Sequence, residues 1–205
     1  MKNLKVKEDG SIILKNVQTS YLFCFDPQEN INDDGTKTLK YKCTSLLDKV
    51  EHKEEIKKLQ ELLLERQKEV FKSRLPADRL CLRDGDLSGK EEYEGKWLLV
   101  ASEREDHPPA CIDRDGKRKV KKSDDKLYSG CIANVMVRFW DQGAPGSKPN
   151  KGGKRINANF LGIQWVNEGT RFSAVSRPKA DEMFDSEGEV ESGDPWADDE
   201  EGDGL

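Results

Sequence analysis

The sequence is poor in the residues that usually build catalytic and metal centres. Histidine occurs only at His52 and His107, so there is little capacity for general-base chemistry of the usual kind. The five cysteines are widely spaced and form no CxxC pair, which argues against a structural zinc site. Walker-type, GxSxG and HExxH motifs are also absent. We therefore predict that this protein is not an enzyme and uses no metal and no cofactor.

Long hydrophobic runs are missing as well. No stretch approaches the roughly 18 apolar residues of a membrane helix, and the first ten residues contain no segment that resembles a signal peptide. We expect a cytosolic protein without membrane contact. Widely spaced cysteines of odd number in such a protein are expected to be reduced core thiols. These cysteines are Cys24, Cys43, Cys81, Cys111 and Cys131.

Basic residues are absent from the last 25 positions, Asp181 to Leu205, which contain 12 acidic residues. The whole chain has 35 basic and 40 acidic residues, so residues 1–180 carry a net charge of +7. We predict a folded basic domain at residues 1–178 and a disordered acidic tail at residues 179–205. Such a tail can compete with nucleic acid for a basic groove.

The remaining sequence predicts a mainly β fold with one prominent helix. A helix is expected from about Lys49 to Lys72, because apolar residues recur at helical spacing after Asp48, an N-cap residue, and Pro76 stops the run. Many short strand-like runs with Gly-rich connections favour a small closed β-barrel or sandwich. The expected strands are residues 11–25, closed by Asp26-Pro27, and residues 36–47, 80–83, 96–102, 110–112, 127–140, 158–167 and 170–175.

Basic and aromatic residues on these strands are typical of single-stranded nucleic-acid binding, in which rings stack on unpaired bases. Tyr21, Phe23 and Phe25 are predicted to share one strand face, and Lys40 and Lys42 another. Most aromatic residues are expected in the core. Trp140, beside Arg138 in alternation and next to a basic loop, is the best exception. The predicted DNA-binding residues are Tyr21, Lys40, Lys42, Arg138, Trp140, Lys148, Lys151, Lys154 and Arg155.

Two further basic segments are predicted to add positive charge to the surface of the domain. The loop from Asp141 to Arg155 is rich in glycine and lysine and could wrap a phosphate backbone, although a solvated surface loop explains it equally well. The run Lys117 to Lys122 follows an Asp-Gly turn. It resembles a nuclear localisation signal, but a basic hairpin arm is at least as good an interpretation.

One pair of carboxylates leaves an enzymatic alternative open. Asp84 and Asp86 could ligate magnesium in a metal-dependent nuclease. An Asp-Gly turn explains the same residues better, because the further acidic ligands of such a site cannot be assigned.

Several motifs in order resemble the OB-fold single-stranded-DNA-binding proteins of tailed bacteriophages, a family long known as a domain of unknown function. The resemblance covers about residues 12 to 175 and implies a five-stranded OB-fold β-barrel with extra strands and hairpins. It also implies that the loop from Gly143 to Arg155 helps bind DNA. The motifs are LRDGD (82–86), Tyr93 and Gly95 with WLLVAS, HPP (107–109) with Asp113, LYSGCIANVMVRFW (127–140) and GKRINANFLGIQWVNEGTRFS (153–173).

The resemblance implies a protein that coats and protects single-stranded DNA with little sequence preference during phage DNA replication or recombination, in the cytoplasm of the host bacterium. Its tail resembles the acidic C-termini of phage replication single-strand binders, which implies that Trp196 and Leu205 contact phage or host replication proteins. Duplex DNA is expected to bind more weakly, and the sequence leaves open a monomer or a homodimer. A protein-interaction module with a DNA-mimicking tail is the remaining alternative.

Overall fold

The computed structural model describes residues 2–32, 35–147 and 152–172, and residues up to Phe172 form one compact unit. The strands are β1 (Leu4–Val6), β2 (Ser11–Ile31), β3 (Lys37–Asp48), β4 (Leu82–Asp84), β5 (Lys96–Arg104), β6 (Ala110–Ile112), β7 (Ile132–Gln142) and β8 (Arg155–Asn167). The main helix is α1 (Lys53–Arg66), which continues into a π-helical turn (Gln67–Phe71). Helical turns of the 3-10 type are residues 77–79, 85–87, 91–93 and 122–124.

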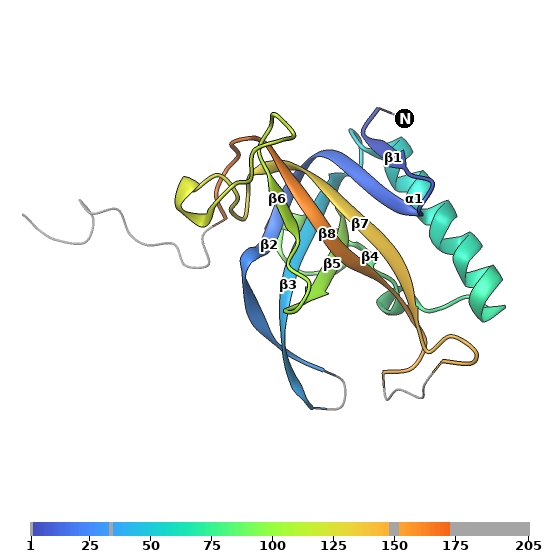
Figure 1. Cartoon of the computed structure of the whole chain (residues 1–205). Helices are drawn as coiled ribbons and strands as arrows, with labels where there is room; N and C mark the ends of the chain where they lie inside the picture. Colours follow the sequence, from blue (N-terminus) through green and yellow to red (C-terminus); the bar gives the residue numbers. More distant parts are fainter. Residues whose placement is uncertain (1, 33–34, 148–151, 173–205) are drawn as a thin grey trace, which may run out of the picture. The chain divides into compact units, whose positions relative to one another are not determined.

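In the described residues, five strands close into a barrel in the order β2, β3, β5, β8, β7 and back to β2 (Figure 1). All neighbouring barrel strands are antiparallel except β5 and β8, which run parallel and meet at Ser102 and Asn159. Numbered along the chain, the barrel strands are paired in the order 1-2-3-5-4. This arrangement confirms the predicted OB-type barrel, with β1, β4 and β6 as extra strands.

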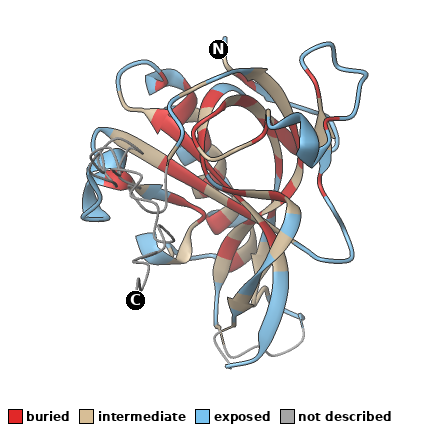
Figure 2. Ribbon diagram, turned by 90° about the vertical axis from the view of Figure 1, so that its left-hand side faces the viewer, coloured by how far each residue is buried: buried red, intermediate tan, exposed pale blue. Residues whose placement is uncertain are grey.

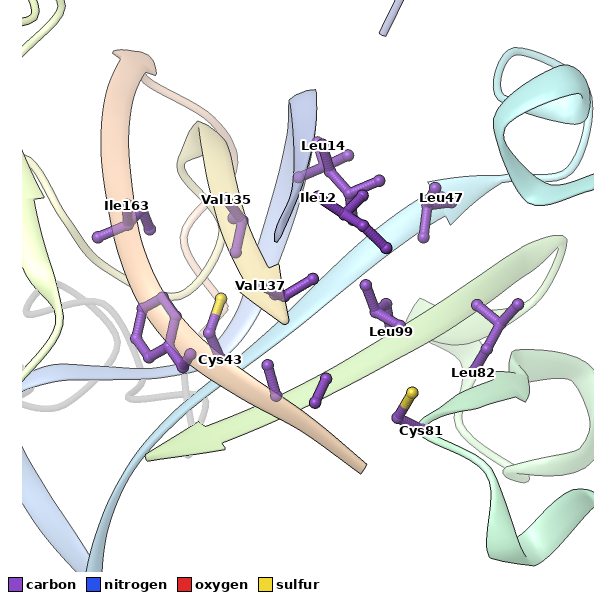
Figure 3. Packing of buried hydrophobic residues seen from close by; sticks show 14 of the residues in the cluster. Ile12, Leu14, Cys43, Leu47, Cys81, Leu82, Leu99, Val135, Val137 and Ile163 are labelled. Atoms are coloured by element: carbon purple, nitrogen blue, oxygen red, sulfur yellow. The ribbon is translucent and has the colours of Figure 1, made fainter. Parts of the chain in front are cut away.

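The core fills the barrel because inward and outward residues alternate along each strand. On β7, Val135, Val137 and Phe139 are buried, whereas Arg138 and Trp140 are exposed. Figure 3 shows Val135 and Val137 in one buried cluster with Ile12 from the neighbouring strand β2 and Leu99 from β5, and Figure 2 shows buried residues concentrated along the barrel interior. All five cysteines lie in the described part and are free thiols, four of them buried, which confirms their prediction as reduced core residues.

Strand β2 is longer than the sequence predicted. Asp26-Pro27 was expected to end it, yet β2 continues to Ile31. The pairing of β2 with β3 shifts register between Phe23 and Gln28, so Pro27 lies in an irregular stretch of the strand. Proline is tolerated there because regular pairing does not require a backbone N–H at that position. The same irregularity corrects a second prediction: Phe25 packs against the core, whereas Phe23 lies opposite Lys42.

The helix is confirmed, but its start is not. Asp48 was expected as the N-cap, and α1 instead begins at Lys53 after His52. The Asp48 carboxylate accepts hydrogen bonds from the backbone N–H groups of Val50 and Glu51 at 2.8 and 3.0 Å, so it caps the turn before the helix. The helical segment ends at Lys72, which has a left-handed backbone.

Other boundaries shift by a few residues: β5 continues to Arg104, β7 runs from Ile132 to Gln142, and β8 begins at Arg155. Thr170 to Phe172 do not form the expected last strand, and Ser173 to Val175 lie outside the described residues. No helix in the described ranges is long and apolar enough to cross a membrane.

Candidate nucleic-acid interface

A row of cross-strand neighbours runs around the outer wall of the barrel. Arg138 on β7 pairs with Asn159 on β8, and Asn159 pairs with Ser102 on β5. Ser102 then pairs with Lys42 on β3, and Lys42 with Phe23 on β2. Direct partners in a sheet point to the same face, so these five side chains form a polar, basic and aromatic band.

A groove borders this band at Asn159, where β8 meets the end of β5. Its volume is about 610 Å³. Trp140 forms one wall with 40% of its surface exposed, while Val137 and Phe139 on the same strand are buried. We call this the Trp140 groove; its lining residues are Glu103, Arg104, His107, Pro108, Trp140, Asn159, Phe160 and Leu161.

Arg104 also lines a second groove of about 440 Å³, which contains Lys40, Thr38 and Leu39 from the β2–β3 hairpin. The two grooves therefore meet at Arg104, which pairs with Lys40 in the sheet. The β2–β3 and β7–β8 hairpins project from the same end of the barrel (Figure 1). This joined surface combines an exposed indole ring with two basic side chains.

The loop after β5 holds Arg104 in place. The guanidinium of Arg104 donates two hydrogen bonds to the Asp106 carboxylate, at 3.1 and 2.7 Å, and Nδ1 of His107 donates to the same carboxylate at 2.9 Å. The hydrogen bond from His107 and the charge of Arg104 hold the pKa of Asp106 below its usual range. Asp106 thus fixes both residues beside the groove and partly neutralises Arg104.

Arg138 has a comparable internal partner. Its guanidinium donates to Oδ2 of Asp9 at 2.6 Å, from the turn between β1 and β2. Hydrogen bonds from the side chain and backbone of Ser11, together with Arg138, lower the pKa of Asp9 to about 2. Asp9 is therefore charged at neutral pH and forms an ion pair with Arg138. Both side chains of this pair are about half exposed, at 46% and 50%.

The remaining predicted residues are spread over other surfaces. Nζ of Lys42 donates to the Glu29 carbonyl at 3.4 Å. Lys154 lies above the Phe71 ring, 5.9 Å from its centroid, and Arg155 donates to the Asp78 carbonyl at 3.5 Å, so both face the segment that follows α1. Lys148, Lys151, Trp196 and Leu205 lie outside the described residues.

Tyr21 is exposed, as a stacking residue must be, but a lysine covers it. It adopts a left-handed backbone (φ 46°) at a register shift of β2, and 49% of its surface is exposed. Nζ of Lys90 lies 4.8 Å from the ring centroid and donates to the Tyr21 hydroxyl. A base could stack on Tyr21 only after Lys90 moves.

The acidic pair considered for a nuclease has a structural role. Nζ of Lys49 lies 2.6 Å from both the Asp84 and the Asp86 carboxylate. Asp84 also accepts from the Asp86 N–H at 3.1 Å, and Asp86 from the Gly95 N–H at 2.7 Å. The two residues therefore tie the LRDGD turn to the β3 end and the β5 start, which agrees with the Asp-Gly turn interpretation.

Sequence reasoning missed Arg104, His107 and Asn159. Arg104 continues the alternation of the predicted strand 96–102, and His107 lies in the HPP motif, so both signals were present. Neither the pairing of Arg104 with Lys40 nor that of Asn159 with Ser102 could be read from sequence, since both depend on register between distant strands.

Comparisons with known proteins agree with the predicted resemblance. A sequence profile described as Enterobacter phage Enc34, ssDNA-binding protein, matches residues 10–194. Putative protein p50 of Acyrthosiphon pisum secondary endosymbiont phage 1 is 31% identical over 108 residues, which cover 53% of each protein. This chain thus matches about half the length of that relative.

Solved structures support the same assignment. The single-stranded DNA-binding protein from bacteriophage Enc34 in complex with ssDNA is 27% identical, with a TM-score of 0.71 over 84% of this chain and 95% of that chain. A C-terminal truncation of the Enc34 protein is 26% identical, with a TM-score of 0.69 over 84% and 94%. Similarity to a family of binding proteins confirms the prediction of a non-enzymatic protein. Because the profile matches most of the sequence, this chain belongs to the family of the Enterobacter phage Enc34 ssDNA-binding protein.

Proposed function

We propose that this chain binds single-stranded DNA with little sequence preference through the joined grooves of the barrel. The observation that carries the proposal is the exposed Trp140 ring beside Arg104 and His107, on the outer wall of an OB-type barrel. Every base has a flat face, so stacking on an indole tolerates any sequence. The same chemistry disfavours duplex DNA, whose bases are already stacked.

Phosphates would be neutralised by the basic side chains that surround Trp140. Lys40 and Arg104 lie toward the β2–β3 hairpin, and Arg138 lies two residues before Trp140 on the same strand face. Asn159 contributes a neutral amide between them. Each phosphate contact releases condensed counterions, so the affinity is expected to fall steeply with salt. We further propose that the protein coats the strand during DNA replication or recombination in the cytoplasm of the host bacterium.

Replacement of Trp140 tests the stacking step. We expect Trp140→Ala to weaken binding of oligo-dT by about 1 to 3 kcal/mol and to reduce the quenching of tryptophan fluorescence. Trp97→Phe is the matched control, because Trp97 packs against the core. Unchanged affinity and quenching in Trp140→Ala would show that DNA does not use this groove.

The acidic residues of the C-terminal segment are proposed to compete with DNA. They place 12 negative charges on the same chain as a body of net charge +7. A chain ending at Lys179 is expected to bind oligo-dT more tightly than the full chain, and the difference is expected to shrink as salt screens the charges. Equal affinities at low salt would remove this competition. Trp196 and Leu205 remain the proposed contacts to replication proteins.

A further inference from the structure

Two of the five cysteines lie next to each other although they come from distant parts of the chain. The Cys111 sulfur on β6 lies 3.8 Å from the Cys24 carbonyl oxygen on β2, to which its S–H donates. The Cys24 S–H in turn donates a hydrogen bond to the Cys111 sulfur. No other pair among the five cysteines, all of which are described, shares a hydrogen bond. The fold therefore brings together one pair of thiols that are 87 residues apart in sequence.

The two thiols differ in exposure and in acidity. Cys24 is buried, whereas Cys111 is partly exposed. The hydrogen bond from Cys24 lowers the pKa of Cys111, and the same contact together with burial raises the pKa of Cys24. Because the thiolate is the form of cysteine that attacks a peroxide, Cys111 is the thiol that reacts first with a peroxide from solvent. Cys24 is the neighbouring thiol that can resolve the oxidised product.

The three remaining cysteines are poorer targets for an oxidant. Cys43 and Cys131 have no exposed surface, and Cys81 is also buried. Burial raises the pKa of all three, so the thiolate is scarce at neutral pH. The Cys131 sulfur is also within 3.4 Å of the Thr19 hydroxyl. Oxidation is therefore expected at Cys111 rather than at these three residues.

The backbone at Cys24 leaves room for the sulfur atoms to approach each other. A disulfide holds its sulfur atoms about 2.05 Å apart, which is closer than a hydrogen bond. Cys24 lies in the stretch of β2 where the pairing with β3 passes from Phe23 directly to Gln28. A small shift of this stretch breaks no regular pairing with β3. Cys111, in contrast, is opposite Ile163 in the parallel pairing of β6 with β8.

We propose that Cys111 and Cys24 are a peroxide-sensitive pair that closes to a disulfide. The Cys111 thiolate attacks one oxygen of hydrogen peroxide, the O–O bond breaks, and the products are the sulfenic acid of Cys111 and hydroxide. The Cys24 sulfur then attacks the sulfenic sulfur, the S–O bond breaks, and the oxygen leaves as water with the Cys24 proton. The hydroxide takes up the proton that Cys111 lost on ionisation. Two thiols thus lose two electrons and two protons, and one peroxide is reduced to two water molecules.

The disulfide would anchor β6 to β2. Strand β6 is three residues long, and its partner in the sheet is β8. His107 and Pro108, which line the Trp140 groove, precede β6 by only a few residues. Oxidation would therefore also restrain one wall of this groove. The chemistry of the pair itself does not depend on whether the groove binds DNA.

Oxidation of the full-length protein tests the pair directly. The protein is treated with hydrogen peroxide, its free thiols are blocked with iodoacetamide, and it is digested without reductant for mass spectrometry. We expect two of the five thiols to be lost, a link between the peptides that contain Cys24 and Cys111, and recovery of both thiols with dithiothreitol. Retention of all five thiols, a link between two chains, or oxidation of Cys111 without a link would overturn the inference. This measurement needs no variant.

Single variants separate the roles of the two thiols. Cys24→Ala is expected to leave the Cys111 sulfenic acid unresolved, so that dimedone labels it several-fold more than in the wild-type protein. Cys111→Ser is expected to protect Cys24 from peroxide, because Cys24 is buried. Cys81→Ala is the matched control, since it removes a different buried cysteine and is expected to leave the link unchanged. Equal dimedone labelling of Cys24→Ala and the wild-type protein would contradict the resolving role of Cys24.

Hydrogen exchange measures the anchoring of β6. The backbone amides of residues 110–112 are expected to exchange several-fold more slowly in the oxidised than in the reduced protein, because the disulfide opposes local opening of the strand. β4 is the internal control, as it is also three residues long and contains no cysteine. Equal exchange of β6 in the two forms would show that the disulfide does not anchor the strand.

Discussion

Asp9→Asn is expected to increase the affinity for single-stranded DNA. The Asp9 carboxylate now holds the Arg138 guanidinium at 2.6 Å, and with a pKa of about 2 it is charged throughout the neutral range. The pair is about half exposed, so the interaction contributes little to stability and a phosphate can replace it. Asparagine keeps an oxygen that can accept from Ser11, which preserves the turn before β2.

The size of the effect follows from counterion release. If the freed Arg138 neutralises one more phosphate, the slope of log K against log salt becomes steeper by about 0.7. Two proteins with equal affinity at 1 M salt would then differ about fivefold at 0.1 M. A weak general effect of the lost negative charge adds to this difference, which a control variant must measure.

Fluorescence titration of labelled oligo-dT at several salt concentrations gives both the slope and the affinity. Glu54→Gln is the control, because it removes one negative charge from the exposed surface of α1. The double variant Asp9→Asn with Arg138→Gln is expected to lose the gain, since the two residues act through one contact. A slope in Asp9→Asn equal to that of Glu54→Gln would refute Arg138 as a phosphate contact.

Other predictions concern the fold around the grooves. Gly85→Ala is expected to cost about 1 to 3 kcal/mol in urea unfolding, because its Cβ would lie 2.2 Å from the Tyr93 carbonyl oxygen and 2.6 Å from that of Lys96. Burial raises the pKa of Cys81 to about 12, whereas a hydrogen bond with Cys24 lowers that of Cys111, so Cys111 is expected to react first with a thiol reagent. Hydrogen bonds from Arg118 and Lys126 hold the pKa of Asp113 well below its usual value, so the charged carboxylate stabilises the folded state. This stabilisation is present above about pH 4 and is lost on acidification. Asp113→Asn is expected to remove it from acid-unfolding curves.

Local patterns predicted those parts of the structure that depend on neighbouring residues. The alternation of Val137, Arg138, Phe139 and Trp140 assigned two residues to the core and two to the surface, and the structure agrees. The Asp-Gly turn before Lys117 predicted a hairpin, which is also present. Each of these features follows from strand periodicity or turn chemistry within a few residues.

The same reasoning gave wrong predictions where the strand pairing or the turn is irregular. Tyr21, Phe23 and Phe25 alternate in sequence, but register shifts in β2 direct them to different surroundings. Asp48 resembled an N-cap because the turn before α1 uses the same hydrogen bonds as a helix start. The Trp140 groove depends on the parallel contact of Ser102 with Asn159, which joins strands 57 residues apart and leaves no local signal.

The cations in and beside the grooves have partners within the protein, which affects how strongly salt would weaken DNA binding. Arg138 is held by Asp9, Arg104 by Asp106, and Lys42 by the Glu29 carbonyl. In each case a phosphate would replace a protein oxygen, and for the two arginines that oxygen belongs to a carboxylate. The released carboxylates would then remain near the DNA and repel it. The salt slope is therefore expected to be smaller than about 0.7 for every cation counted on the surface. Replacing the acidic partners Asp9 and Asp106 is therefore a more direct way to change the affinity for DNA than adding lysines.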